Sequence, residues 1–435
     1  RCPSGLRLAC PAMHLRRRTW VTIAVAALLL LAVGAAVAYR IATSRTADVH
    51  RGNQLPFTLT TASTATTANG GGPADTPWPT YGFDAARGRD ASALTSVRPP
   101  YRVSWSAPQH ALLEFPPSYA GGVLYLADDG GTVSALRLNG GGVLWSRHIS
   151  ASRPQGAMAD QPTVWGNEVI VDSFNQNVYA LRRSDGRVLW VRHTADLLES
   201  SPAVSAGRVF VGGWSGHVYA LSAATGRVLW TFSAAGAVKD SMAVSGNRVY
   251  FGDYAGVMYS LVASTGRLVW RTQTAGLAGG YRSGTFYATP SVAYGRVYAA
   301  NTDGKVYAFE QSTGQIAWTH TFPNWAYGSP AVSAGRVFST SFDGTFAALS
   351  ARTGALLWSH VLPHKTLSSP TVIGRLVYVA DLGTGGGSRG NLYAYDPASG
   401  RLVWRFADGK YSTVVAAAGH LVVAGFSRLY VLTPR

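Results

Sequence analysis

One tryptophan recurs through most of this chain at nearly constant spacing, and this repeat constrains the fold more than any other feature. Seven tryptophans follow one another at intervals of 45, 40, 40, 48, 40 and 46 residues: Trp145, Trp190, Trp230, Trp270, Trp318, Trp358 and Trp404. A period of this length that holds four short strands is typical of a β-propeller blade and not of a helical solenoid. The sequence therefore predicts an all-β ring of blades.

Residues 201–230 show the repeating unit most clearly. Four runs of alternating apolar and small or polar residues, at 202–205, 208–212, 217–221 and 227–230, are separated by Ala-Gly, Ser-Gly and Thr-Gly pairs. Each break holds a glycine that can adopt positive φ, so each break predicts a tight turn between two strands. We expect one antiparallel four-stranded sheet for each repeat.

The two ends of the chain supply an eighth blade. Residues 411–432 give three strands without a final tryptophan, whereas residues 101–107 form a lone strand whose Trp105 lies 40 residues before Trp145. Joining these segments closes the ring and leaves only short, protected sheet edges. The prediction is an eight-bladed β-propeller over residues 76–435, in which strand 101–107 is the outer strand of the last blade.

The last turn follows the pattern Ala-x4-Thr/Ser-Gly-x3-Trp in four repeats, as in Ala220, Thr225, Gly226 and Trp230, and the other repeats depart from it only by Ser260 for the alanine and by Asp185 or Gly140 for the threonine. This pattern resembles the tryptophan-docking repeat of the pyrroloquinoline quinone (PQQ) propeller superfamily, and the resemblance covers residues 76–435. It implies that eight tryptophans dock neighbouring blades together: Trp105, Trp145, Trp190, Trp230, Trp270, Trp318, Trp358 and Trp404. The superfamily includes quinoprotein dehydrogenases, BamB-like assembly proteins and scaffolds without a cofactor, so the resemblance is specific for the fold and much less so for function.

The chain begins with a candidate membrane segment. Residues 20–39 carry no charge, and a stretch of this length is long enough to cross a bilayer. Three arginines at 16–18 outweigh those that follow, which predicts a cytoplasmic tail over residues 1–19. We expect a single-pass signal anchor in the cell membrane, a flexible Thr/Ala/Gly linker over residues 40–75, and an extracytoplasmic propeller. The small residues Ala36 and Ala38 leave a cleaved signal peptide as the alternative.

The connections from one blade to the next gather at one end of the central channel. Aligning the repeats on Pro202 places acidic residues there in the first four blades and mostly tyrosines in the others, and two longer connections add further aromatic and basic residues. We predict that this channel mouth is a ligand-binding site. Its predicted residues are Glu114, Asp160, Glu199, Asp240, Tyr281, Arg282, Tyr287, Trp325, Tyr327 and Tyr411.

The sequence contains no clear motif for a metal site or for nucleic-acid binding. The ten histidines include no His-x-x-x-His pair, and both cysteines, Cys2 and Cys10, precede the propeller, so no metal site is predicted. Isolated serines, histidines and aspartates occur throughout the blades, which leaves a catalytic triad open. The net charge of +17, without a run of Lys or Arg in the propeller, indicates attraction to anionic cell-envelope components and not to nucleic acid.

These observations favour a non-enzymatic, monomeric, membrane-anchored propeller that binds a protein or an anionic cell-envelope component and needs no cofactor. The resemblance implies two alternatives, which are a PQQ-dependent quinoprotein dehydrogenase with Ca²⁺ beside its PQQ, and an outer-membrane protein assembly factor of BamB type. Four acids at the mouth would repel the three carboxylates of PQQ unless a cation lay between them. They suit a ligand with a cationic or hydroxyl-rich part, while the tyrosines suit a planar or apolar part.

Overall fold

The computed structural model describes residues 23, 25–34, 47–59, 76–109, 111–149, 157–274, 284–384, 389–409 and 414–435. The chain divides into two compact units, Arg1–Ala47 and Asp48–Arg435. In the first unit, residues 23 and 25–34 are helical and their large apolar side chains are exposed. The described residues contain no helix that is both long and apolar enough to cross a membrane. The predicted tail over residues 1–19 and most of the predicted linker lie outside the described residues.

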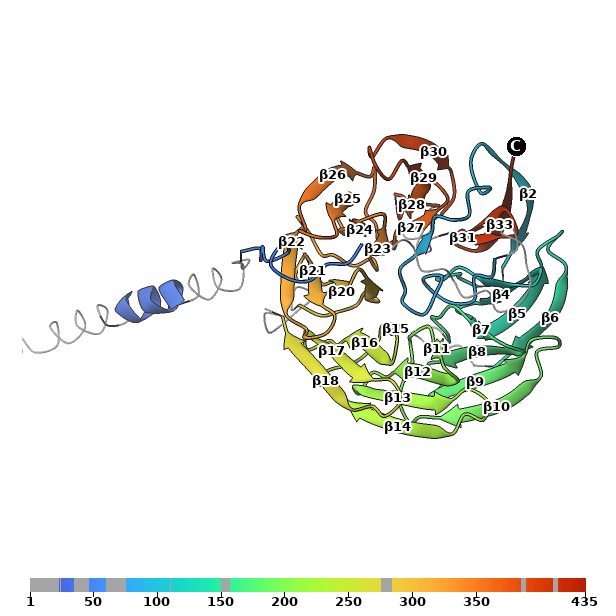
Figure 1. The fold of residues 1–435 in the computed structure, drawn as a ribbon, viewed down its shortest axis with the longest axis horizontal. Coiled ribbons are helices and arrows are strands. Elements are labelled where there is room, and N and C mark those ends of the chain that lie inside the picture. The colour runs from blue at the N-terminus through green and yellow to red at the C-terminus, as the bar shows by residue number, and fades with distance from the viewer. Residues whose placement is uncertain are drawn as a thin grey trace, which may run out of the picture. The chain divides into compact units, whose positions relative to one another are not determined.

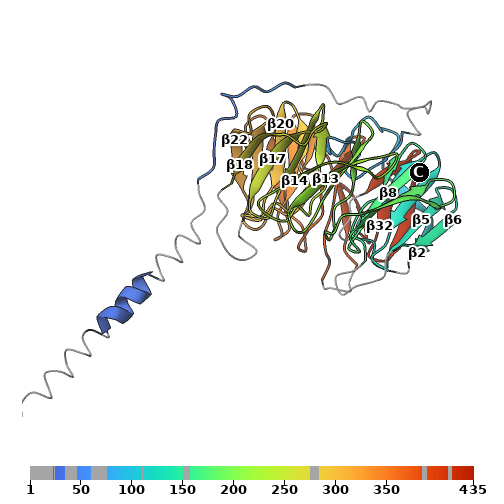
Figure 2. The same ribbon diagram turned by 90° about the horizontal axis from the view of Figure 1, so that it is seen from below.

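The second unit is a ring of eight antiparallel sheets among the described residues, which confirms the predicted all-β, eight-bladed propeller (Figure 1). Seen from the side, the strands run between the two faces of the ring (Figure 2). In seven blades the strands follow one another in sequence order from the channel outward.

The first four blades have these strands. They are β3 (Ser118–Ala120), β4 (Val123–Ala127), β5 (Thr132–Arg137) and β6 (Val143–His148); β7 (Thr163–Trp165), β8 (Glu168–Ser173), β9 (Asn177–Arg182) and β10 (Val188–His193); β11 (Ala203–Ser205), β12 (Arg208–Gly212), β13 (His217–Ser222) and β14 (Val228–Ser233); β15 (Ala243–Ser245), β16 (Arg248–Gly252), β17 (Val257–Val262) and β18 (Leu268–Gln273).

The next three blades repeat the pattern. They are β19 (Ser291–Ala293), β20 (Arg296–Ala300), β21 (Lys305–Glu310) and β22 (Ile316–Thr321); β23 (Ala331–Ser333), β24 (Arg336–Thr340), β25 (Thr345–Ser350) and β26 (Leu356–Val361); β27 (Thr371–Ile373), β28 (Leu376–Ala380), β29 (Leu392–Tyr395) and β30 (Leu402–Phe406). The short β1 (Asp90–Ala91) adds a parallel fifth strand to the seventh blade.

The eighth blade combines both ends of the propeller. It contains β31 (Val415–Ala417), β32 (His420–Ala424) and β33 (Arg428–Pro434), and its outer strand is β2 (Tyr101–Pro108). The antiparallel pairing of β2 with β33 places the red C-terminal strand beside a blue-green strand in Figure 1. Because the N-terminal strand β2 pairs with the C-terminal strand β33, the ring closes and β33 is not left as an exposed sheet edge.

Each docking tryptophan packs on the next blade along the chain. The indole Nε1 of Trp230 donates to the carbonyl of Ala263 at 2.9 Å, and its ring covers Gly266, where a Cβ would lie 2.7 Å from the ring carbons. The motif alanine, Ala220, pairs directly with Trp230 in the neighbouring strand. The same indole-to-carbonyl bond to the following blade is made by Trp105, Trp145, Trp190, Trp270, Trp318 and Trp358. Trp404 instead packs edge-on against Tyr101, with ring centroids 5.0 Å apart.

The segment before β2, residues 76–100, crosses the channel, and we call it the lead-in. Backbone carbonyls at 79, 85, 86, 88 and 89 accept hydrogen bonds from inner-strand amides of five different blades. Arg87 is 1% exposed, and its guanidinium donates to the carbonyls of Tyr81, Met242 and Pro202. Because all of these contacts except the one to Tyr81 join residues far apart in the sequence, the lead-in links the inner strands of several blades beneath the mouth.

Residues 48–59 depart from the predicted flexible linker over 40–75, because they are fastened to the fifth blade. Backbone bonds join Thr319 N to Val49 O at 3.0 Å and Arg51 N to Ala317 O at 2.7 Å, which forms an isolated antiparallel bridge between His50 and Trp318 at the edge of β22. Asp48 accepts hydrogen bonds from Thr319 and Thr321. We call this segment the strap. The composition of residues 40–75, with few large apolar residues, predicts a flexible linker and so did not reveal that the strap is bound.

Candidate functional site

The channel mouth holds a cavity of about 120 Å³ above the lead-in. Seven of the eight positions that the repeat alignment places there line it, and the eighth, Tyr411, lies outside the described residues. The seven are Glu114, Ala159, Glu199, Lys239, Tyr287, Tyr327 and Leu367. The alignment thus located the cavity, because equivalent residues of successive blades reach the same height in the channel.

An ion pair connects the acidic side of the cavity to an aromatic cluster. The Nζ atom of Lys239 lies 3.3 Å from a carboxylate oxygen of Glu199, and both side chains are 15% exposed. The same Nζ lies 3.3 Å from the centre of the Trp214 ring and 5.1 Å from that of Tyr254. Glu199 also accepts a hydrogen bond from Tyr287 at 3.0 Å. Burial, cation–π contacts and the ion pair therefore hold this ammonium in place.

Two further acids of the mouth are held in unfavourable surroundings for a negative charge. Burial, with added repulsion from Glu199 and Asp129, raises the pKa of Glu114 to about 7. Burial and repulsion from Glu199 raise the pKa of Asp240 well above its usual range, and Lys239 only partly opposes this. Asp240 is 4% exposed, and neither of its carboxylate oxygens has a hydrogen-bond partner among the described residues. A cation in the cavity would relieve both side chains.

The opposite side of the cavity is aromatic. The rings of Tyr287 and Tyr327 stack with centroids 4.3 Å apart. Tyr81 of the lead-in also lines the cavity, and its hydroxyl lies 3.2 Å from the hydroxyls of Ser329 and Ser369. The mouth therefore has an acidic side and a tyrosine side, as the sequence predicts, and a tyrosine contributed by the lead-in.

Some predicted residues do not line the cavity. Asp160 is buried within the second blade, where it accepts a hydrogen bond from the amide of Asp172 at 3.0 Å. Trp325 stacks on Phe342 with centroids 5.1 Å apart. Tyr281, Arg282 and Tyr411 fall outside the described residues. The ligand-binding role of the whole set stays a prediction.

Sequence reasoning left out four residues that shape the mouth. Lys239 occupies the same repeat position as Glu199, so the alignment contained it, but its role depends on Trp214 and Tyr254. These two aromatics follow the second strands of adjacent blades at equivalent positions, a signal that the repeat could have provided. Tyr81 belongs to no repeat, so no alignment of blades could have placed it.

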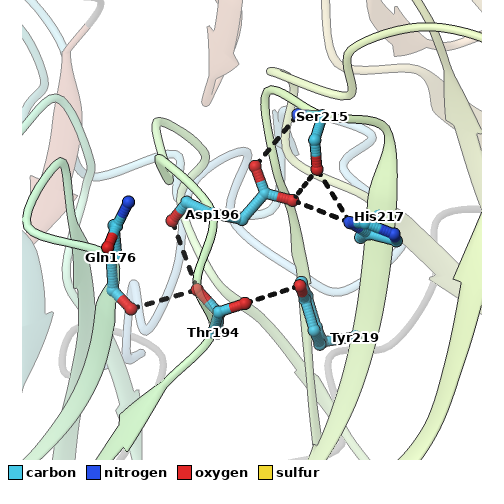
Figure 3. Close-up of polar contacts among 6 residues, drawn as sticks. All are labelled: Gln176, Thr194, Asp196, Ser215, His217 and Tyr219. Atoms are coloured by element: carbon cyan, nitrogen blue, oxygen red, sulfur yellow. Dashed lines mark hydrogen bonds and ion pairs between the residues drawn. The ribbon is translucent and has the colours of Figure 1, made fainter.

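A Ser-His-Asp cluster occurs on the third blade, and its geometry differs from a catalytic triad (Figure 3). Ser215 Oγ and Asp196 Oδ2 both approach the same ring nitrogen of His217, Nδ1, at 2.7 and 3.2 Å. A triad needs the serine on one ring nitrogen and the carboxylate on the other. The Asp196 carboxylate also accepts the amide of Ser215, so the cluster stabilises the turn that follows β12.

The mouth does not fit PQQ and Ca²⁺. A cavity of about 120 Å³ is smaller than the roughly 300 Å³ at which typical ligand pockets begin. Lys239 is the one cation among the described lining residues, and it is already paired with Glu199, so no lining cation is available for three carboxylates. The described residues also contain no cluster of three His, Cys, Asp or Glu side chains that could hold a metal ion.

Fold and site together define an eight-bladed propeller of the PQQ-like class with a small acidic and tyrosine-lined mouth. The family model described as outer membrane protein assembly factor BamB matches residues 81–201, 175–287 and 276–433. The chain therefore belongs to this family. No curated protein sequence matches it significantly.

Solved structures with the same fold have different functions. BamB from Moraxella catarrhalis is 20% identical, with a TM-score of 0.63 over 77% of this chain and 98% of its own. Quinohemoprotein alcohol dehydrogenase from Comamonas testosteroni is 15% identical, with a TM-score of 0.66 over 82% and 80%. The computationally designed protein Ika8 is 15% identical, with a TM-score of 0.60 over 75% and 100%. At these identities the likeness establishes the fold alone.

Proposed function

We propose that this protein is a non-enzymatic, membrane-tethered binding module whose propeller holds a protein ligand at the channel mouth. The observation that carries the proposal is the two-sided cavity: on one side both carboxylate oxygens of the buried Asp240 have no hydrogen-bond partner among the described residues, and on the other side Tyr287 and Tyr327 stack. A buried carboxylate without a partner is costly, so it is expected where a ligand supplies the missing donor.

The tether in this proposal rests on residues 20–39. They form an uncharged apolar stretch preceded by three arginines, which favours a single-pass anchor with its amino terminus in the cytoplasm. The propeller would then lie outside the cytoplasm as a monomer. Its net charge outside residues 1–72 is +17 − 7 = +10, since those residues hold eight arginines and one acid, and this excess favours contact with anionic envelope components.

A second candidate is a part in outer-membrane protein assembly. The family match over residues 81–433 favours it, because the family model carries the BamB description. This role is a specific form of the binding proposal, in which the ligand is an assembly partner. The quinoprotein alternative receives no such support from the mouth, which lacks the space and the lining cations for PQQ.

Site-specific photo-crosslinking in cells tests the proposal. A photoreactive residue replaces Leu367, which lines the cavity, and in a matched control it replaces Val361, which is 74% exposed on an outer strand of the same region. We expect a discrete crosslinked product from position 367 that weakens when Tyr327 is changed to alanine. A product from position 361 alone would contradict a ligand at the mouth.

A further inference from the structure

Asp240 differs from Glu199, which lies on the same acidic side of the cavity. Glu199 accepts a hydrogen bond from Tyr287 and pairs with Lys239, whereas both carboxylate oxygens of Asp240 are without a hydrogen-bond partner among the described residues. Asp240 is 4% exposed and lines the cavity. The fold thus places a buried acceptor without a partner in the wall of the cavity, where a ligand that enters could supply the missing donor.

The protein itself shows how this mouth binds an ammonium group. The Lys239 ammonium is held by the Glu199 carboxylate and by the faces of Trp214 and Tyr254. A carboxylate with aromatic faces is a favourable environment for an alkylammonium ion. Asp240, Glu114 and the stacked tyrosines offer the same combination a second time, and no second cation lines the described part of the cavity.

We propose that the cavity receives one lysine side chain of the protein partner, with its ammonium between Asp240 and Glu114 and its alkyl stem against Tyr327. This rests on the proposed function, because it assigns a chemical class to the ligand of the same mouth. The small volume favours a single unbranched stem over a sugar ring. Lysine also suits the site better than arginine, whose planar fork needs acceptors placed for bidentate bonds.

The proposal carries a pH dependence. Among the described residues, the charged and titratable groups around Glu114 and Asp240 are Glu199, Asp129, Lys239, Tyr81, Tyr287 and Tyr327. Because burial raises the pKa of Glu114 to about 7, ammonium binding at neutral pH releases a proton. The affinity for the lysine ammonium group should therefore rise with pH and level off above the pKa of Glu114. Ionisation of Glu114 alone should raise this affinity by about tenfold between pH 6 and pH 8.

Calorimetric titration of the purified full chain with a capped Gly-Lys-Gly tripeptide tests the site. Capped Gly-norleucine-Gly lacks the ammonium, Gly-Arg-Gly carries guanidinium, and glucosamine presents an amine on a sugar ring. We expect the lysine peptide to bind best. Asp240→Asn should weaken it at least tenfold, and Asp185→Asn, on an exposed hairpin residue, should leave it unchanged. Glu114→Gln should remove most of the rise between pH 6 and 8.

Equal binding of the lysine and norleucine peptides, or equal effects of the Asp240 and Asp185 variants, would overturn the proposal. Stronger binding of glucosamine would assign the amine to a sugar and overturn the choice of a protein lysine. If Asp240→Asn leaves the crosslink from position 367 intact, the lysine site is wrong while the proposed function stands. A wild-type protein without that crosslink contradicts the proposed function itself.

Discussion

The contact between Trp230 and Gly266 allows the docking of neighbouring blades to be measured. Gly266 has φ of +72°, and a Cβ there would lie 2.7 Å from the Trp230 ring. Gly246→Ala is the matched control, because Gly246 has φ of +57° but no atom within 4 Å of an added Cβ. The control variant should lose about 1 kcal/mol of unfolding free energy from backbone strain alone. Gly266→Ala should lose about 2–4 kcal/mol, because overlap with the ring adds about 1–3 kcal/mol.

A double-mutant cycle with Trp230→Ala separates strain from docking. Trp230→Ala alone should cost about 3–5 kcal/mol, the usual range for a large buried aromatic. In that background Gly266→Ala should cost no more than Gly246→Ala, because the ring that it meets is gone. Urea unfolding followed by fluorescence gives the four free energies. If Gly266→Ala and Gly246→Ala are equally destabilising in the wild-type protein, the tryptophan does not dock the blades in the way described.

Three further results are expected. Deleting residues 101–108 should leave β33 as an open edge and make the protein insoluble or much less stable, whereas deleting residues 1–47 should leave thermal unfolding unchanged. The amide of Thr319, which donates to Val49, should exchange slowly with solvent deuterium, and deleting residues 1–59 should speed its exchange; equal rates would show that the strap is not bound. Burial raises the pKa of Glu114 above its unfolded value of 4.5, so the stability that this group contributes is fully present below pH 4.5 and is lost as the pH rises through about 7. Glu114→Gln should remove this fall, which is on the order of 3 kcal/mol, and an unchanged pH profile would contradict the burial of this carboxyl.

The repeat explains why the sequence predicts the ring and the mouth. Each blade needs an alanine or a similarly small residue opposite its own tryptophan and a glycine under the tryptophan of the preceding blade, so the spacing of these residues follows directly from the packing. The residues at the mouth recur at one position per blade, and Glu199, Tyr287 and Tyr327 are brought together for that reason.

Features outside the repeat could not be predicted in this way. The strap binds through Asp48 and through Phe57, whose ring lies against Arg296 and Arg352, and these contacts join residues more than 200 positions apart. Tyr81 reaches the cavity because the lead-in crosses the channel, which no periodicity describes. The bond from the amide of Asp172 to Asp160, by contrast, belongs to the repeat, because the amides of Gly212 and Ala380 donate to Ser200 and Ser368 at the equivalent positions.

The measurement that tests the central claim most directly is a calorimetric titration of the purified chain with PQQ in the presence of Ca²⁺, together with dye-linked oxidation of alcohols and sugars. A binding module whose mouth repels carboxylates should give no binding heat and no oxidation. Saturable micromolar binding of PQQ that is lost on Glu199→Ala or Asp240→Ala would contradict the account and assign the mouth to a quinone cofactor.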